Sequence, residues 1–93
     1  MSNITTTCTN GPYIMSYDTN GKVFSTQQPS VHPLLVTPMV VGTMESRTIA
    51  PVVLMPGKEN TKQYRRDMDL AVRAANAFNK LLADNGVEGF TAA

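Results

Sequence analysis

The strongest constraint on the fold is a helical pattern near the C-terminus, from Thr61 to Asn85. A side-chain oxygen of Asn60 or Thr61 can cap the first turn, and Gly86 can adopt the left-handed conformation that ends a helix. Apolar residues inside the segment recur at alternating spacings of four and three, which places them on one side of a helix. They are Tyr64, Met68, Ala71, Ala75, Phe78 and Leu82. The pattern predicts one long helix with a buried stripe.

A second apolar line runs beside this stripe, and it widens the apolar arc to more than half of the helix circumference. Its members are Leu70, Ala74, Ala77 and Leu81, with Val72 bordering the stripe on the other flank. One face of a small sheet covers less than that. Either loops and the proline-rich segment cover the surplus, or the second line is an interface with another copy of the chain or with a partner protein.

Asp67 lies inside the apolar arc, where an unpaired charge is costly. One interpretation is that it sits near the start of the helix, interacts favourably with the helix dipole and reaches solvent or an arginine. The other is a specific polar contact within a binding surface or an oligomer interface.

Tyr13 to Phe24 shows the pattern of a β-hairpin, with Asn20 and Gly21 as the two central residues of a type I′ turn. In that register Tyr17 lies opposite Phe24, and Met15 lies opposite Thr26. The register predicts an inward-facing set made of Tyr13, Met15, Tyr17 and Phe24. The same aromatic side chains and Tyr64 could stack on nucleic acid bases, but they are also the large aromatics available to a core without tryptophan.

A second hairpin is predicted from two apolar, β-branched runs, Met39 to Met44 and Arg47 to Met55, joined at Glu45-Ser46. Pro51 inside the second run indicates an edge strand or a bulge, because proline has no backbone N–H to donate. Before these runs, prolines at 29, 33 and 38 leave Leu34 to Val36 as the best short strand candidate.

The predicted fold class is therefore α+β, a small antiparallel sheet of two hairpins and about four strands packed with one long C-terminal helix. The expected single domain covers residues 11–86, with the sheet in 12–55 and the helix in 61–85. Residues 1–10 are expected to be a flexible arm, or an edge strand whose order depends on a partner. Residues 87–93 are expected to be a tail.

Basic residues cluster along the helix, while the net charge of the whole chain is only +1. Alternating charges on a helix face are typical of a solvated surface, but a phosphate-bearing ligand at the helix N-terminus is the competing interpretation. The candidate anion-binding residues are Lys58, Thr61, Lys62, Arg65, Arg66 and Arg73, with Lys80 extending the basic face. Glu59 follows Gly57-Lys58 where a Walker A loop needs Ser or Thr, so nucleotide hydrolysis is disfavoured.

The titratable residues do not form a recognisable catalytic or metal-binding pattern. One cysteine, Cys8, and one histidine, His32, exclude the common Cys/His zinc sites and make a reducing compartment the better fit. Asp67 and Asp69 should point to different sides of the helix, and Asp18 and Glu45 should lie at hairpin turns, so paired carboxylate chemistry is not expected. We therefore expect no catalytic residues, no metal and no cofactor.

These observations favour a non-enzymatic interaction protein, homo-oligomeric, that blocks, sequesters or scaffolds another protein. The alternative is a binder of a nucleotide or nucleic acid. Residues 1–10 lack the charge and apolar pattern of a secretory signal, and no run approaches the roughly 20 apolar residues that span a bilayer. The expected location is the cytoplasm, of the host cell if the source is viral, because the size and the missing cofactor motifs are typical of viral or mobile-element accessory proteins.

Overall fold

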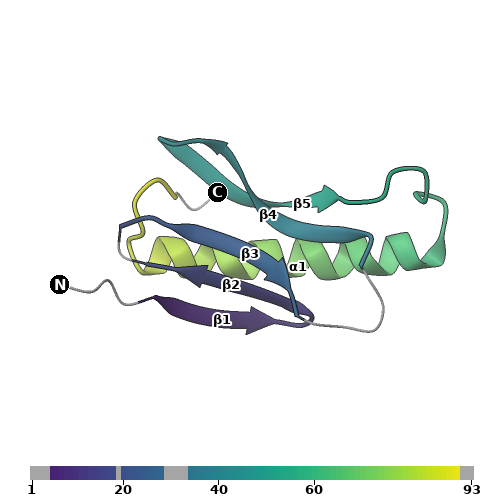
Figure 1. Ribbon diagram of the computed structural model, residues 1–93, viewed down its shortest axis with the longest axis horizontal. Helices are drawn as coiled ribbons and strands as arrows, with labels where there is room; N and C mark the ends of the chain where they lie inside the picture. The colour runs from purple at the N-terminus through teal and green to yellow at the C-terminus, as the bar shows by residue number, and fades with distance from the viewer. Residues whose placement is uncertain (1–4, 19, 29–33, 91–93) are drawn as a thin grey trace.

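The computed structural model describes residues 5–18, 20–28 and 34–90 of the 93-residue chain. Five strands form two antiparallel sheets, and one long helix packs against them (Figure 1). The elements are β1 (Thr6–Asn10), β2 (Tyr13–Tyr17), β3 (Val23–Gln27), β4 (Val36–Thr43), β5 (Ser46–Val53) and α1 (Lys62–Asp84). The predicted α+β class is confirmed, with one strand more than expected and two sheets in place of one.

The first sheet has the order β1-β2-β3. A flexible arm or an edge strand was predicted for residues 1–10. Of these, residues 6–10 form the edge strand β1, which pairs with β2 of the same chain. The remaining residues of the segment, apart from Thr5, lie outside the described ranges. Three of the five residues of β1 are β-branched threonines, which suit a pleated strand, and a polar segment can therefore join the sheet.

The register of β2 and β3 differs from the predicted one by one residue, because the connecting loop is longer than a two-residue turn. The Asp18 N–H donates to the Lys22 carbonyl at 3.0 Å, and Oδ1 of Asp18 accepts from the backbone N–H groups of Asn20 and Lys22. Gly21 has φ +86°, whereas no described residue other than glycine has a positive φ, so Asn20 does not adopt the type I′ conformation.

This slip moves Phe24 to the other face of the sheet. Ser16 lies opposite Phe24, and Tyr17 lies opposite Val23. Tyr13, Met15 and Tyr17 are buried as predicted, but the predicted inward position of Phe24 is wrong: it is 59% exposed. A shift of one residue exchanges the two faces of a strand, so a single loop residue decides which aromatic enters the core.

The second sheet is the predicted hairpin, built from β4 and β5. Thr43 pairs with Ser46, so the turn is Met44-Glu45 and not Glu45-Ser46 as predicted. Pro38 lies directly opposite Pro51 in the ladder. Because neither residue has an N–H, they occupy a pair without ladder hydrogen bonds, and the predicted edge position of Pro51 is confirmed.

The free edge of β5 is closed by other parts of the chain. Asn79 of α1 accepts from the Ile49 N–H and donates to the Ile49 carbonyl, both at 2.8 Å. The Arg47 N–H donates to the Gly89 carbonyl at 2.8 Å, and Pro51 has no N–H. From Arg47 to Pro51, every residue that faces away from β4 therefore either donates its N–H within the chain or is a proline, which leaves no free donor to pair with another strand.

The helix agrees closely with the prediction. Oγ1 of Thr61 caps it by accepting from the Tyr64 N–H at 3.1 Å. At the other end Gly86, with φ +64°, donates its N–H to the Ala83 carbonyl, and the Val87 N–H donates to the Leu82 carbonyl. These two bonds form a Schellman motif, and the apolar side chains of Val87 and Leu82 are both buried beside it.

The predicted tail is instead packed onto the domain. Val87 and Phe90 are buried in the core, and Phe90 forms a bridge with Arg47 of β5. The Arg47 guanidinium carbon lies 4.5 Å from the centre of the Phe90 ring. Residues 87–90, which follow the helix stop at Gly86, are too few to show a periodic pattern. Their packing could therefore not be predicted from the sequence. Residues 91–93 lie outside the described ranges.

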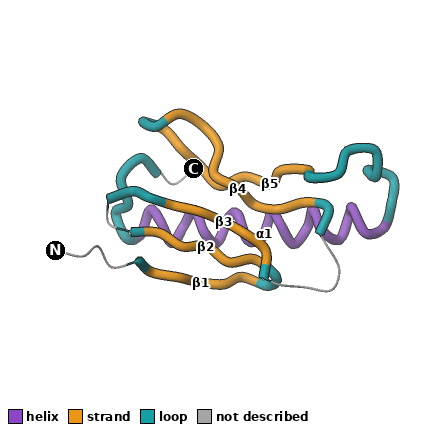
Figure 2. Tube along the Cα trace, viewed as in Figure 1, coloured by secondary structure: helices purple, strands orange, loops and turns teal. Residues whose placement is uncertain are grey.

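The core lies between α1 and the inner faces of both sheets, and α1 packs mainly on β4 and β5 (Figures 1 and 2). Its largest contributors are Tyr13, Met15, Tyr17, Leu35, Val36, Ile49, Phe78 and Leu82. The predicted helix stripe is confirmed, since Ala71, Ala75, Phe78 and Leu82 are buried and Tyr64 and Met68 are half-buried against the core.

Candidate interaction surfaces

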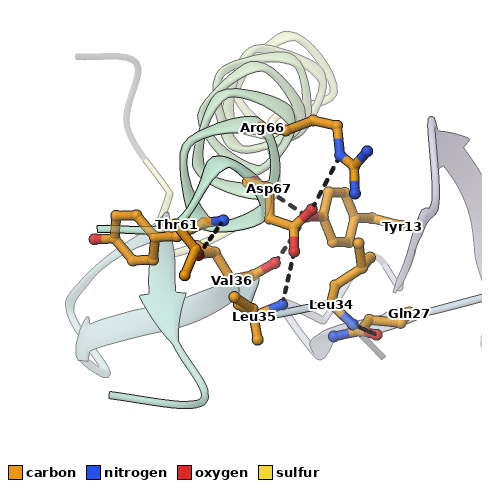
Figure 3. A network of polar contacts seen from close by, with 9 residues as sticks. Tyr13, Gln27, Leu34, Leu35, Val36, Thr61, Arg66 and Asp67 are labelled. Atoms are coloured by element: carbon orange, nitrogen blue, oxygen red, sulfur yellow. Dashed lines mark hydrogen bonds and ion pairs between the residues drawn. The ribbon is translucent and has the colours of Figure 1, made fainter. Parts of the chain in front are cut away.

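A buried polar network joins α1 to the start of β4 (Figure 3). The Asp67 side chain is fully buried, and its Oδ2 accepts from the Leu35 N–H at 2.9 Å. Oδ1 lies 3.8 Å from Nε of Arg66, whose side chain is exposed. Asp67 thus reaches an arginine and a backbone donor of its own chain, and it does not reach solvent.

Tyr13 belongs to the same network. Its hydroxyl donates to the Val36 carbonyl at 2.8 Å and lies 3.5 Å from the carbonyl oxygen of Asp67. Burial, with the negative charge of Asp67 as a second cause, raises the pKa of Tyr13 to about 12. The phenol therefore stays a neutral donor near neutral pH, and the arrangement connects β2, β4 and α1.

The titratable candidates among the described residues lie apart from one another. Sγ of Cys8 lies 3.7 Å from the Met15 carbonyl, and burial raises the pKa of this thiol. His32 lies outside the described residues. Asp67 is buried whereas Asp69 is exposed and pairs with Arg73, so the two carboxylates point to different sides as predicted. Among residues 5–18, 20–28 and 34–90, no three His, Cys, Asp or Glu side chains gather as a metal site.

The basic helix face divides into a paired and an unpaired part. Arg73 pairs with Asp69 at 3.2 Å, and Lys80 pairs with Asp84 at 2.7 Å, which raises the pKa of Lys80. These two pairs have the i, i+4 spacing of a solvated helix surface. Lys58, Lys62 and Arg65 form no ion pair within the described part of the chain.

Two polar groups of the loop before α1 are already bonded within the loop. The Gly57 N–H donates to the carboxylate of Glu59 at 3.0 Å, a bond that lowers the pKa of Glu59. The Thr61 hydroxyl donates to the Lys58 carbonyl while it caps the helix. Of the predicted anion-binding residues, Lys58, Thr61, Lys62, Arg65 and Arg66 lie at this end of α1, and Arg73 lies further along the helix.

The predicted helix interface is largely covered by the chain itself. Ala74 is fully buried, so it is not available to a partner. Leu70 and Leu81 are half-buried against the core, and Ala77 is exposed. The two sheets and the packed C-terminal segment cover more of the helix than one sheet face would, which is why the predicted surplus is small.

The larger apolar surface lies on the β4–β5 hairpin, where the sequence interpretation did not place it. Met39 and Val41 of β4 are exposed, Met44 at the turn is 91% exposed, and Leu54 and Met55 beyond β5 are 45% and 46% exposed. Met39 pairs with Ala50 on the face opposite the one that Ile49 buries against the helix side. The sequence does indicate this surface, because apolar residues occupy both odd and even positions of these two strands. Such a pattern leaves neither face of the hairpin polar.

Comparison of the chain with protein-family models, with curated proteins and with solved structures finds no match. Within the described residues, no helix is long and apolar enough to cross a membrane.

Proposed function

We propose that this protein is a non-enzymatic interaction protein that binds, and thereby blocks, sequesters or scaffolds, another protein. The observation that carries the proposal is the apolar solvent face of the β4–β5 hairpin, with Met39, Val41 and Met44 exposed. An antiparallel sheet with one solvated face normally alternates apolar and polar residues, and this hairpin does not.

A protein partner suits this surface better than a small molecule. A single sheet face is open, whereas small ligands are bound in concave sites that bury most of their surface. Three of the six methionines of the chain are exposed here: Met39 and Met44 in the hairpin, and Met55 just beyond its end. Methionine side chains are flexible and polarisable, and they are common on surfaces that adapt to protein partners.

Site-specific photo-crosslinking in the source cell tests the proposal. A photoreactive side chain at Met44 should capture a defined protein, and the same group at Asn76 on the exposed helix face should not. The double variant Met39→Asp and Val41→Asp should lose the captured protein and keep the unfolding temperature within about 3 °C of the wild type, since both side chains are exposed. Capture that is equal from positions 44 and 76, or that survives the double variant, contradicts the proposal.

A phosphate-bearing ligand remains the second candidate, favoured by the charge distribution. Residues 58–67 contain four basic and two acidic residues, a net charge of +2 in a chain whose total is +1. A thermal-shift screen with nucleotides, oligonucleotides and polyphosphate tests this candidate, because a ligand at 100 times its Kd stabilises the fold by about 2.7 kcal/mol. An unchanged melting temperature in all of them, or an equal shift in Lys62→Gln/Arg65→Gln, contradicts it.

A further inference from the structure

The direction of the backbone groups in β1 follows from the neighbouring hairpin. The Asp18 N–H points to β3, where it meets the Lys22 carbonyl. Because direction alternates along a strand, Ser16 and Ile14 also point to β3, and Tyr13, Met15 and Tyr17 point to β1. Their partners Asn10, Cys8 and Thr6 therefore point to β2. The N–H and carbonyl groups of Thr7 and Thr9 are left pointing away from the sheet.

Within Thr6–Asn10, this edge lacks the sequence features that commonly protect edge strands. The strand reads Thr-Thr-Cys-Thr-Asn and contains no proline and no charged residue. At the opposite side of the molecule, Asn79, Pro51 and the C-terminal segment close the edge of β5. One edge is thus closed by three separate groups, whereas no described residue covers the other edge along Thr6–Asn10, and an extended strand can pair with it over its whole length.

The apolar flank of α1 that remains partly exposed lies on the same side of the molecule as the β1 edge. Asn79 marks the flank of α1 that faces β5. At about 100° per residue, Leu70, Ala77 and Leu81 lie about 160° to 200° around the helix from Asn79. They therefore occupy the flank on the β1 side, where Ala77 is exposed and the two leucines are only partly buried. Two independent features, free backbone groups and residual apolar surface, meet on one side of the molecule.

We propose that β1 pairs with β1 of a second copy of this chain, antiparallel, about a two-fold axis beside Cys8. Cys8 is the central residue of the strand, so this axis pairs the whole strand with itself. Thr7 of each copy then exchanges backbone hydrogen bonds with Thr9 of the other copy, and their hydroxyl-bearing side chains share one face. An uncharged, self-complementary strand brings no like charges together, which favours a second copy over a charged peptide.

The closed β5 edge sets the size of the assembly. Pairing at β1 joins the two three-stranded sheets into one sheet of six strands. The outer ends of the pair are then the β5 sides of the two copies, where Asn79, Pro51 and the C-terminal segment leave no comparable edge for a third copy. The other two edge strands, β3 and β4, lie against each other within each copy. The pairing is isologous and stops at a dimer. It does not involve the β4–β5 hairpin, so it stands apart from the function proposed above.

Light scattering on the full-length chain during size-exclusion chromatography tests the dimer. The wild type should show twice the chain mass of 10.1 kDa. Thr7→Pro removes an outward N–H that the β1–β2 ladder does not use, so it should weaken the dimer about tenfold or more without unfolding the chain. Thr7→Val is the matched control, since it loses the same hydroxyl contact to Ser16 but keeps the N–H, and it should remain a dimer. A monomer mass for the wild type, or a dimer mass that Thr7→Pro does not reduce, overturns the proposal.

Oxidation of Cys8 tests the register. In the proposed pairing the two cysteines face each other in a pair without ladder hydrogen bonds, where the Cα atoms are about 4.5 Å apart and within reach of a disulfide. Diamide, which takes up the two thiol hydrogens, should therefore cross-link the wild-type chain into a covalent dimer and should fail with Thr7→Pro. Because Thr7→Pro and Met39→Asp/Val41→Asp act on different surfaces, loss of the dimer and loss of partner capture are distinguishable. A dimer that dissociates in Thr7→Pro but does not cross-link through Cys8 overturns the Cys8-centred register.

Discussion

The edge strands β1 and β5 differ in how the backbone groups that point away from their sheets are satisfied. Both have backbone groups that no neighbouring strand satisfies. Along β5 these groups meet Asn79 of the helix and Gly89 of the C-terminal segment, or are removed by Pro51. Along β1, Thr7 and Thr9 have no such cover from β2. Edge protection in this molecule therefore comes from tertiary contacts with distant parts of the chain, and these contacts cover β5 but not β1.

Arg47 holds the C-terminal segment against β5, so its loss should produce the largest effect. Its Nη1 donates to the Gly21 carbonyl at 2.7 Å and its Nη2 to the Glu88 carbonyl at 2.8 Å, while its guanidinium lies over Phe90. Arg47→Ala removes these contacts together and should lower the free energy of unfolding by about 2–4 kcal/mol in urea titrations.

Arg73→Ala is the matched control for Arg47→Ala. It removes an exposed arginine with one i, i+4 partner, and it should cost less than about 0.5 kcal/mol. If the two variants unfold at the same urea concentration, Arg47 does not anchor the segment.

Tyr13 of β2 connects the two sheets through its hydrogen bond to the Val36 carbonyl of β4. Its raised pKa predicts that the folded state loses stability at high pH. The folded pKa, about 12, exceeds the ordinary value of 10.0, so the folded state holds the phenol proton more tightly. Stability is therefore complete below pH 10 and falls as pH rises towards 12, by about 2–3 kcal/mol over those two units. Urea unfolding of the wild type and Tyr13→Phe from pH 8 to pH 12 measures this component. Parallel curves for the two proteins would contradict it.

Asn79 closes the middle of the β5 edge, and Asn79→Ala should cost about 2 kcal/mol because two hydrogen bonds are lost and the backbone groups of Ile49 are left unpaired. The opened edge should also produce assemblies larger than a dimer as concentration rises. Asn76→Ala, on the exposed face one turn earlier, should change neither stability nor mass. Sedimentation velocity at several concentrations would show whether the two alanine variants differ.

The smallest effect is expected on the open edge itself. Thr9→Lys places a charge on β1 without touching the core, so the free energy of unfolding of the isolated chain should change by less than about 0.5 kcal/mol. The same charge should still reduce self-association, because protective lysines act at exposed edges. A large loss of stability measured under dilute conditions would mean that the side chain of Thr9 supports the fold, against its exposed position.

Local rules were sufficient for the helix and for the presence of both hairpins. The cap at Thr61, the stop at Gly86 and the spacing from Tyr64 to Leu82 are properties of neighbouring residues, and the structure has all of them. The two apolar runs around Glu45 likewise predicted the β4–β5 pairing, because turn residues between β-branched runs act over short distances.

Tertiary structure decided what depends on residues far apart in the sequence. Arg47 gave the segment from Val87 to Phe90 a place in the core, because its backbone N–H donates to the Gly89 carbonyl. The outward position of Phe24 is an exception, since it follows from local bonds of Oδ1 of Asp18 to Asn20 and Lys22 that the sequence pattern did not reveal. The partner of Asp67 is a backbone N–H 32 residues away, and the closure of β5 depends on Asn79, 30 residues from Ile49. Periodicity records which face of an element is apolar, but it carries no information on which distant donor or acceptor will meet that face. The open and closed edges could therefore be recognised only once the chain was folded.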